Sequence, residues 1–523
     1  MNREYILSKI KEAPDEIRDV IIIGGGATGL GAAVDAAARG FSAILFEQAD
    51  FAKGTSSRST KLVHGGVRYL AEGDISLVFE ALRERGLLMQ NAPHLVSDRE
   101  FIIPNYEWWE GPFYSIGMKV YDRMAGKLGF GHSRKIDKET IVKLIPNLND
   151  NGLKGGVIYY DGQFDDSRLA INLAQTFAEN GGLPVNYARV SGLLKDKDGF
   201  IEGVSVKDLV NDEEFIVKGK TVINAAGVFA GKIAELDNPD SPSLIRPSQG
   251  VHIVLDKSFL EGDSAIMIPH TSDGRVLFAV PWHNKVIVGT TDTPVDNITL
   301  EPRALEEEIE FLLSTSAQYL NRPPERKDVL SIFAGLRPLA VSPDSPTETK
   351  EISRKHQITV SLSGLITITG GKWTTYRKMG EDVIDKAILV GGLEERKSVT
   401  ENMPIHGYVK NFNPREPLHY YGADKEAIEN DILAKAPGLR KKLHPDLPYI
   451  KAEVIWAARH EMALTVEDIL ARRTRSLFLD AKASIEAAPE VASLLRREFG
   501  KSREWEKEQI ASYTSLAKGY ILE

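Results

Sequence analysis

Three glycines near the N-terminus have the spacing of a dinucleotide-binding turn. Gly24, Gly26 and Gly29 form a GxGxxG pattern directly after the apolar run 20–23, and Glu47 follows 18 residues after Gly29. In such a pattern the first glycine permits a tight turn, the second admits a pyrophosphate close to the backbone, and the third lets a helix pack near a strand. The helix N-terminus faces the phosphates, and an acid at this offset accepts a hydrogen bond from a ribose hydroxyl. The pattern predicts dinucleotide binding but does not specify which dinucleotide.

A second polar block follows at residues 55–70, TSSRSTKLVHGGVRYL, which is crowded with hydrogen-bond donors and contains two adjacent glycines. It is too polar for a core element. Hydroxyl groups and a closely approaching backbone suit the polar edge of a flat ring system. A surface loop is the alternative interpretation.

The elements that would position these residues are a strand at 19–23, a helix at 30–39 and a strand at 42–46. We further expect a strand at 156–160 that ends in a turn at Asp161 and Gly162, a helix at 166–179, a hairpin of 190–194 with 200–206, and a strand at 221–224. From 253 to 288 several strands follow without helices between them. Such a run indicates a mixed or antiparallel sheet, the usual form of a substrate-binding domain inserted into a parallel one.

A second strand–glycine–helix junction occurs late in the chain. A strand at 364–369 is followed by Gly370 and Gly371, and a helix opens at Lys372 and runs to about residue 389. A helix N-terminus stabilises a group that gains negative charge, as a reduced flavin does near N1 and O2. A contiguous NAD domain does not need this late return, so the pattern favours FAD. Beyond about residue 401 helical periodicities dominate.

Composition excludes several classes of protein. The chain has 523 residues, which suggests about three domains at roughly 150 residues each, and a net charge of −9, which argues against a nucleic-acid binder. It contains no cysteine, which excludes disulfides, thiolate metal sites and iron–sulfur clusters; no metal site is predicted. No apolar run is long enough for a spanning helix, and the acidic first nineteen residues do not fit a leader. We therefore expect an intracellular protein that is soluble or lies on a membrane surface.

Several blocks together resemble one family, the FAD-dependent, respiratory, quinone-linked glycerol-3-phosphate dehydrogenases. The resemblance covers nearly the whole chain and keeps the order of its motifs. The blocks are IIIGGGATG at 21–29, GTSSRSTKLVHGGVRYL at 54–70, YYDGQ at 159–163, SDGR at 272–275, GTTDT at 289–293, AGLRPL at 334–339, GGKWTTYR at 370–377 and ARRTR at 471–475.

The resemblance implies an α/β fold with three parts. These are an FAD-binding Rossmann-like domain of the glutathione-reductase type, an inserted mixed β-sheet substrate domain and a C-terminal helical domain. We expect residues 18–92, 151–246 and 352–396 in the first, 93–150 and 247–351 in the second, and 397–523 in the third.

The resemblance also implies the residues that bind FAD non-covalently. The ADP half is expected at Gly24, Gly26, Gly29 and Glu47, with Val190 beside the adenine. The remaining expected contacts, along the pyrophosphate and the ring, are Thr55, Ser56, Ser57, Lys61, Leu62, His64, Gly66, Gly227, Gly371, Lys372, Trp373, Thr374 and Thr375.

The implied reaction is oxidation of sn-glycerol 3-phosphate to dihydroxyacetone phosphate. Because the substrate is a dianion, its site needs fixed cations, and we expect Arg68, Arg337 and Lys372 there, with Tyr69 as a further donor. His252 is our candidate for the base that takes the C2 hydroxyl proton. His64 is the rival and is expected to position the flavin instead.

The resemblance further implies a membrane quinone as electron acceptor, peripheral attachment to the inner face of the cell membrane from the cytoplasm, and a homodimer. The candidate membrane segment is 106–135, in which cations accompany large apolar side chains. Those side chains are Trp108, Trp109, Phe113, Tyr114, Met118, Tyr121 and Phe130. A core helix with a solvated face is the alternative interpretation of this segment.

Three other functions are alternatives to that of the dehydrogenase. A glycerol-3-phosphate oxidase would use the same site and pass electrons to oxygen, giving hydrogen peroxide. A catalytically idle FAD-fold protein would be expected to lack Arg337, Lys372 or His252, and all three are present. An amino-acid oxidase would not need three cations around one end of its substrate.

Overall fold

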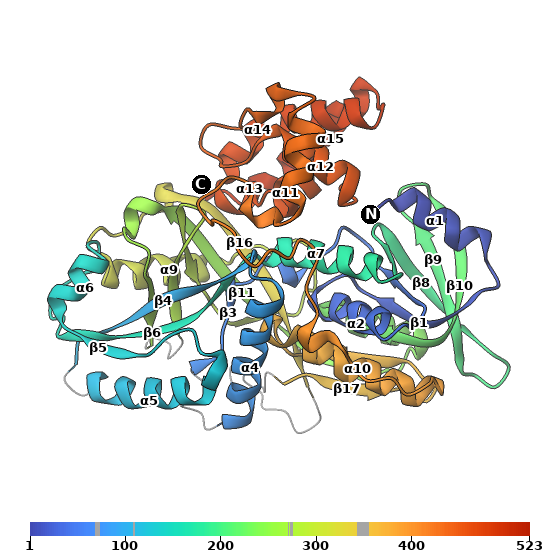
Figure 1. Ribbon diagram of the computed structural model, residues 1–523, viewed down its shortest axis with the longest axis horizontal. Coiled ribbons are helices and arrows are strands. Elements are labelled where there is room, and N and C mark those ends of the chain that lie inside the picture. Colours follow the sequence, from blue (N-terminus) through green and yellow to red (C-terminus); the bar gives the residue numbers. More distant parts are fainter. Residues whose placement is uncertain (68–73, 108–109, 270, 272–275, 342–354, 523) are drawn as a thin grey trace.

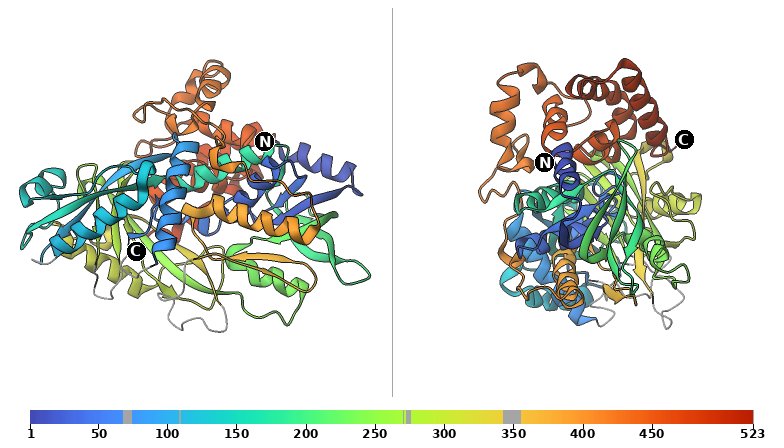
Figure 2. Two further views of the ribbon diagram at one scale, coloured as in Figure 1. Left: turned by 60° about the horizontal axis from the view of Figure 1, so that its bottom comes forward. Right: turned by 90° about the vertical axis from the view of Figure 1, so that its right-hand side faces the viewer.

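A computed structural model describes residues 1–67, 74–107, 110–269, 271, 276–341 and 355–522. Two sheets lie side by side, and the helices after residue 424 lie together on one side of both (Figure 1; Figure 2, right). The chain starts with α1 (Arg3–Glu12), which packs near the strand β7 (Leu183–Val185). Arg68 and Tyr69 lie outside the described residues, as do Trp108 and Trp109.

The first sheet has the order β17–β18–β10–β1–β2–β7, and the β8–β9 hairpin continues from β10. Its central strands are parallel, with Val20 beside both Thr221 and Ala43. Val20, Ile21, Ile22 and Ile23 of β1 are buried, whereas Ile17 at the start of the strand is exposed. Its strands are β1 (Ile17–Ile23), β2 (Ala43–Phe46), β7 (Leu183–Val185), β8 (Ala188–Lys195), β9 (Ile201–Asp208), β10 (Glu213–Asn224), β17 (Gln357–Val360) and β18 (Ile366–Thr369).

Helix α2 (Ala27–Ala38) packs against both α7 (Asp166–Glu179) and α10 (Tyr376–Gly391). The small residues of α2 allow this. A Cβ on Gly31 would lie 2.6 Å from the Tyr376 carbonyl oxygen, and one on Gly380 would lie 2.5 Å from that of Gly31. The late segment 366–391 therefore returns to the N-terminal βαβ unit, as the second glycine junction predicts. Short α8 (Ala230–Asp237) follows β10.

The second sheet is mixed, with the order β15–β11–β14–β13–β12–β4–β6–β3; β16 also pairs with β11, and β5 with β6. Its strands are β3 (Leu62–Val63), β4 (Val96–Asn105), β5 (Arg134–Ile136), β6 (Gly155–Phe164), β11 (Ile245–Asp256), β12 (Ala265–Ile268), β13 (Leu277–Trp282), β14 (Lys285–Gly289), β15 (Thr293–Pro294) and β16 (Val329–Ala340). Its helices are α4 (Ile75–Asn91), α5 (Glu110–Ala125), α6 (Lys138–Leu144) and α9 (Glu306–Tyr319).

The C-terminal helices have a core of their own, which includes Trp456, Leu470 and Leu495 and also takes in Ile287 and Phe333 of the second sheet. They are α11 (Asp424–Ala427), α12 (Lys451–His460), α13 (Ser476–Leu479), α14 (Ala481–Glu498), α15 (Arg503–Lys518) and the π-helices Ile428–Leu433 and Asp468–Arg473. Among the described residues, no helix has the length and hydrophobicity needed to cross a bilayer.

The expected α/β fold with a mixed second sheet and a C-terminal helical part is confirmed. The helix at 166–179 and the hairpin near residue 200 are also as predicted. The prediction of a turn at Asp161 and Gly162 is wrong, because β6 continues through both residues, which pair with Arg99 and Asp98 of β4. A Cβ on Gly162 would lie 2.6 Å from the Val63 carbonyl oxygen, so this glycine marks a close approach of two strands.

The expected division into domains disagrees with the strand pairing in one respect. Residues 62–63 and 155–164 fall within the segments expected to form the FAD-binding domain, but β3 and β6 belong to the second sheet. The segments 18–92 and 151–246 therefore contribute to both sheets. The division itself stays a prediction.

Because α2 starts so close to β1, we predict that Gly29→Ala destabilises the fold. A Cβ there would overlap the Gly24 carbonyl oxygen, and such overpacking costs roughly 1–3 kcal/mol of unfolding free energy. Urea unfolding measures this loss. Gly231→Ala in α8 is the control, since a Cβ there meets nothing within 4 Å; an equal loss in both variants would contradict the close-packing argument.

Candidate functional site

Two adjoining cavities lie where the two sheets meet. The larger, of about 790 Å³, extends from the glycine turn after β1 past Glu47 to the start of α8. The smaller, of about 330 Å³, lies between the 55–67 segment and strands of the second sheet. Their shared wall consists of Thr55, Pro338, Gly370, Gly371, Lys372 and Trp373.

The glycine turn gives the larger cavity a wall made of backbone. Gly24 has φ +113°, and a Cβ there would lie 2.6 Å from the Ala225 carbonyl oxygen. A Cβ on Gly26 would lie 3.1 Å from Ser56 Oγ, which accepts a hydrogen bond from the N–H of Ala27 at 2.9 Å. The first turn of α2 and its positive dipole end therefore adjoin the cavity, as an anionic pyrophosphate requires.

Glu47 lies at the end of β2 on the cavity wall, as the 18-residue offset predicts. Its Oε2 accepts the Gly25 N–H at 2.7 Å, and its Oε1 accepts the Ala49 N–H at 2.9 Å. Burial raises the pKa of this carboxyl group, and the two N–H donors oppose that shift. These bonds fix the carboxylate while each oxygen keeps a lone pair that a ribose hydroxyl can use.

The structure brings most of the expected residues to the two cavities. Val190 and Gly227 line the larger one, far along the chain from the glycine turn. The residues that line at least one cavity are Gly24, Gly26, Glu47, Thr55, Ser56, Leu62, His64, Gly66, Val190, Gly227, His252, Arg337, Gly371, Lys372, Trp373 and Thr374. Gly29, Ser57, Lys61 and Thr375 lie behind the walls instead.

Lys61 lies behind the cavity wall and supports it. Its ammonium group is fully buried, 2.7 Å from Asp166 Oδ2, and it donates to the Ser57 carbonyl oxygen at 2.6 Å. The rings of Trp282, Phe333 and Phe478 surround it at 5.1–5.4 Å. Lys61 therefore holds the 57–61 segment in place rather than projecting into a cavity.

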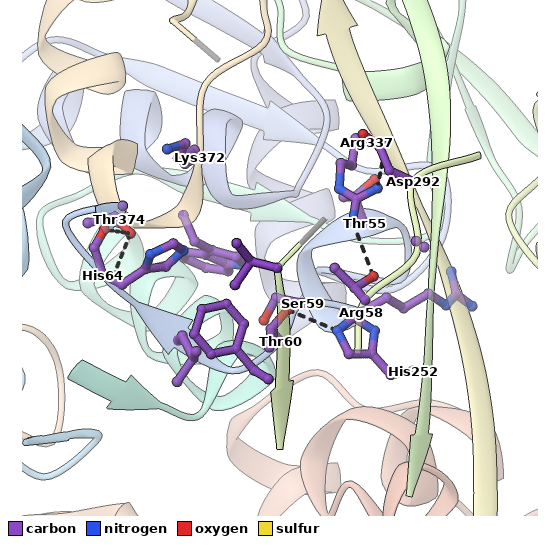
Figure 3. A pocket seen from close by; sticks show the side chains of 18 of the residues that line it. Thr55, Arg58, Ser59, Thr60, His64, His252, Asp292, Arg337, Lys372 and Thr374 are labelled. Carbon is purple, nitrogen blue, oxygen red and sulfur yellow. Dashed lines mark hydrogen bonds and ion pairs between the residues drawn. The ribbon is translucent and has the colours of Figure 1, made fainter. Parts of the chain in front are cut away.

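Arg58, Arg337 and Lys372 line the smaller cavity. The guanidinium group of Arg58 is held by the Lys53 and Leu300 carbonyl oxygens and by Glu301. Arg337 on β16 donates to Thr290 Oγ1 at 3.1 Å and to the Thr291 carbonyl oxygen at 2.9 Å, and it pairs with Asp292 at 3.2 Å. Lys372 precedes the short 3₁₀ turn Trp373–Thr375 at the start of α10. Figure 3 shows Arg337 and Lys372 in different parts of the cavity wall. Such fixed cations suit an anionic ligand.

His252 on β11 is 2% exposed and lines the smaller cavity. Its Nε2 lies 2.9 Å from Thr60 Oγ1, and its ring stacks on Phe333. Burial, and then the charges of Lys61 and Arg337, hold its pKa well below the usual value. The imidazole is therefore neutral at neutral pH and has one nitrogen lone pair available to a proton.

His64 lies apart from His252, beside Thr374 (Figure 3). Burial lowers the pKa of His64 to about 4; nearby Asp161 opposes this shift, and Lys372 and Arg85 add to it. Both histidines are thus neutral near pH 7.

The structure adds residues that the motif analysis did not single out. Thr60 and Asp292 line the smaller cavity, and each contacts a candidate residue there, His252 and Arg337 respectively. Both lie inside blocks that the sequence had marked, TSSRST and GTTDT. The contacts could not be predicted from the sequence, because Thr60 lies 192 residues before His252 and Asp292 lies 45 residues before Arg337.

Comparison with known proteins gives a consistent result. A family model described as "FAD dependent oxidoreductase" matches residues 19–377, and one described as "C-terminal domain of alpha-glycerophosphate oxidase" matches residues 384–509. The mitochondrial glycerol-3-phosphate dehydrogenase of Schizosaccharomyces pombe is 37% identical over 585 residues, covering 99% of this chain and 89% of the relative.

Two solved structures extend the comparison. The glycerol-3-phosphate dehydrogenase of Bacillus halodurans, complexed with FAD, superposes with a TM-score of 0.80 at 27% identity, covering 99% of this chain and 97% of that one. The L-alpha-glycerophosphate oxidase of Mycoplasma pneumoniae has a TM-score of 0.55 at 18% identity, covering 77% and 98%. The second likeness shows a shared fold.

The buried neutral state of His64 predicts a pH-dependent stability. The unfolded chain takes up a proton on His64 below about pH 6.5, whereas the folded chain does so only near pH 4. The folded state therefore loses stability as the pH falls through this window. Between pH 7 and pH 5 the native chain should lose about 2 kcal/mol more unfolding free energy than His64→Gln.

Urea unfolding at both pH values measures this difference. His252 is present in both proteins, so its own depressed pKa does not affect the comparison. Equal losses would show that His64 is not held neutral by the fold.

Proposed function

Because this chain belongs to the family of FAD-dependent glycerol-3-phosphate dehydrogenases, we propose that it oxidises sn-glycerol 3-phosphate to dihydroxyacetone phosphate and passes the electrons to a membrane quinone. FAD is the cofactor of the family. The glycine turn, the adjoining α2 N-terminus and Glu47 line a cavity suited to its ADP half.

The observation that carries this proposal is a cationic cavity that shares a wall with the dinucleotide cavity. Arg337 and Lys372 both line the smaller cavity, and Lys372 also lines the larger one. A phosphate dianion in the smaller cavity would meet the planar guanidinium fork of Arg337, while Lys372 adds a compact ammonium charge on the wall that the two cavities share. It would also bring the rest of a three-carbon substrate beside the shared wall.

The oxidation breaks the C2–H bond and the O–H bond of the C2 hydroxyl group, and C2 becomes a carbonyl carbon. FAD, when bound, supplies the acceptor for the hydride. The protein has to hold the substrate and take up the hydroxyl proton. Proximity of this kind is effective only when the reacting groups are fixed before the reaction.

We assign the hydroxyl proton to His252. Its neutral imidazole lines the same cavity as Arg337, with Thr60 Oγ1 at 2.9 Å from Nε2. A phosphate dianion bound to Arg337 offsets one of the two cations that hold the pKa of His252 down. Substrate binding therefore makes the imidazole a better proton acceptor. His64 remains the rival for this role.

A surface suited to a membrane lies on α4 and α5, which contact each other. Phe113, Ile116 and Val120 are 44–67% exposed and spaced i, i+3, i+7 on one face of α5. Ile75 and Phe79 are exposed on α4, and α5 carries the exposed cations Lys119 and Arg123. Figure 1 places α5 at the edge of the molecule away from the C-terminal helices. Such a face suits the interface of a bilayer.

This surface corrects the sequence-based expectation for segment 106–135. Tyr114, Met118 and Tyr121 were expected among the membrane-facing residues, but they are at most 6% exposed and form part of a core with Phe101 and Tyr159. α5 therefore has a core face and an apolar exposed face. We place the chain on the cytoplasmic side of the membrane, as a homodimer, on the strength of the resemblance alone.

The second candidate is a glycerol-3-phosphate oxidase. The C-terminal family model carries the name of such an enzyme, and the oxidase from Mycoplasma pneumoniae shares the fold. The two functions use the same substrate site and differ in the electron acceptor, so the acceptor must be tested directly.

We predict that glycerol 3-phosphate bleaches the visible flavin band of the FAD-loaded protein under anaerobic conditions. A quinone analogue should restore the band rapidly, and air only slowly. Stopped-flow absorbance measures both steps. Fast recovery in air with formation of peroxide would favour the oxidase, and absence of bleaching would refute the proposed substrate.

The same bleaching assay tests whether Arg337 binds the substrate phosphate. Arg337→Ala should raise the substrate concentration for half-maximal bleaching by roughly 100-fold, because about 3 kcal/mol of charged hydrogen bonding is lost. Arg459→Ala is the control, since Arg459 forms an exposed pair with Glu498 on the C-terminal helices. An unaltered half-maximal concentration in Arg337→Ala would refute phosphate binding by Arg337.

We predict that Phe113→Ser combined with Ile116→Ser releases the protein from vesicles that contain anionic lipids. Each change removes a large exposed apolar side chain from the same face of α5. Co-sedimentation with vesicles should fall at least fivefold, with flavin bleaching unchanged.

Leu362→Ser is the matched control, because Leu362 is fully exposed in the turn between β17 and β18. It should leave sedimentation unchanged. Equal sedimentation of the α5 variant and the native chain would remove α5 from the membrane surface.

A further inference from the structure

The ARRTR segment at 471–475 has no place in the proposed reaction, yet its arginines are among the most deeply buried in the described chain. Arg472, Arg473 and Arg475 are at most 2% exposed. Each pairs with a carboxylate from the first 165 residues. The segment thus links the C-terminal helices to both cavity-bearing parts of the chain.

Arg472 and Arg473 bind the same carboxylate, that of Asp50. Arg472 Nε lies 2.5 Å from Asp50 Oδ2, and Arg473 Nη1 and Nη2 lie 2.6 and 3.0 Å from Oδ2 and Oδ1. Asp50 is fully buried and also accepts from Asn186 at 3.2 Å. Both oxygens of Asp50 are thereby fixed.

Asp50 lies in the 47–56 segment, which forms a wall of the larger cavity. Its carbonyl oxygen accepts the Lys53 N–H at 3.1 Å, and the Ala52 N–H donates to Gly25 at 2.9 Å. Lys53 pairs in turn with Glu467, just before the ARRTR segment, at 2.8 Å. The C-terminal helices therefore hold this segment against the glycine turn.

Arg475 is connected to the smaller cavity through a different carboxylate, that of Asp165. Arg475 Nε lies 2.8 Å from Asp165 Oδ2, and its guanidinium carbon lies 5.0 Å from the centre of the Tyr420 ring and 5.2 Å from that of Tyr449. The neighbouring Asp166 accepts from Lys61 and from Ser59 Oγ, both at 2.7 Å. Thr60, between those two residues, carries the hydroxyl that contacts His252.

Buried ion pairs are weak evidence for stability, because desolvation of the charges offsets their attraction. The C-terminal helices also have an apolar core of their own. Three arginines aimed at two segments that line cavities are better explained by the fixing of those segments, since pre-organised sites need support from the residues behind them.

We propose that the three arginines are positioning residues with separate tasks. Arg472 and Arg473 fix the 47–56 wall for FAD, and Arg475 fixes the 59–61 segment, whose Thr60 contacts His252, for the substrate. The FAD task is independent of the reaction, whereas the substrate task rests on the proposed function.

The FAD task is tested by the rate at which the holoenzyme releases FAD after dilution, followed by the fluorescence of the freed flavin. Arg473→Lys keeps the charge but loses the two-pronged contact, and should release FAD at least tenfold faster. Its half-maximal substrate concentration at saturating FAD should stay within twofold. Glu467→Gln, a milder change at the pair with Lys53, should speed release about threefold and keeps the test valid if Arg473→Lys does not fold.

The substrate task is tested with Arg475→Lys. Release of FAD should stay within twofold of the native rate, while bleaching by glycerol 3-phosphate should become at least fivefold slower or need fivefold more substrate. Asp165→Asn is the second variant, because asparagine keeps the N-cap of α7 but removes the charge. It should change bleaching in the same direction.

Arg39→Lys is the matched control. Arg39 pairs with Asp35 at 2.6 Å with both side chains 1% exposed, and neither residue is among those that line the two cavities described above. It should lower the melting temperature without changing FAD release or bleaching.

The proposal is overturned if Arg473→Lys and Glu467→Gln behave as Arg39→Lys does. It is also overturned if Arg475→Lys speeds FAD release as much as Arg473→Lys. If the native holoenzyme is not bleached by glycerol 3-phosphate at all, the proposed function and the substrate task fail together, and the FAD task is decided by the release rates.

Discussion

The close approach of α2 to β1 and α10 is the constraint on which the site depends. Gly24, Gly29 and Gly31 remove the side chains that would hold these elements apart. Only then can the first turn of α2 adjoin a cavity walled by backbone, and only then can the late helix α10 pack beside it. The start of α10 brings Lys372 and Thr374 to the same region. Tight packing and an anion-binding wall therefore have one origin.

The second sheet supplies the chemistry that the first cannot. Its strands β11 and β16 carry His252 and Arg337, while the shared wall at 370–373 comes from the junction of β18 and α10. Burial among these elements keeps the imidazoles of His252 and His64 neutral, while Asp292 pairs with the guanidinium group of Arg337. A site in which charged and neutral groups have fixed states before the substrate arrives loses little energy to rearrangement during the reaction.

Much of this arrangement could be predicted from local sequence, because GxGxxG, the acid at residue 47 and the glycine pair at 370–371 each act on their immediate neighbours. Features that depend on distant partners could not. The pair Asp161 and Gly162 has the residue types of a turn, but Gly162 lies within a strand and allows β3 to approach closely. Tyr114 and Met118 are residue types found at membrane surfaces, but here they are buried in a core. The support given by Lys61 and Asp292 likewise depends on residues that the chain brings close only when folded.

The distance along the chain between Asp50 and its arginines has a consequence for biosynthesis. The carboxylate of Asp50 is paired by a residue 423 positions later. While the ribosome is still making the first four hundred residues, this buried charge has no guanidinium partner, and the wall that contains it lacks its outer support. Insertion of the cofactor is therefore expected to follow translation of the helical part rather than to accompany synthesis of the N-terminal βαβ unit.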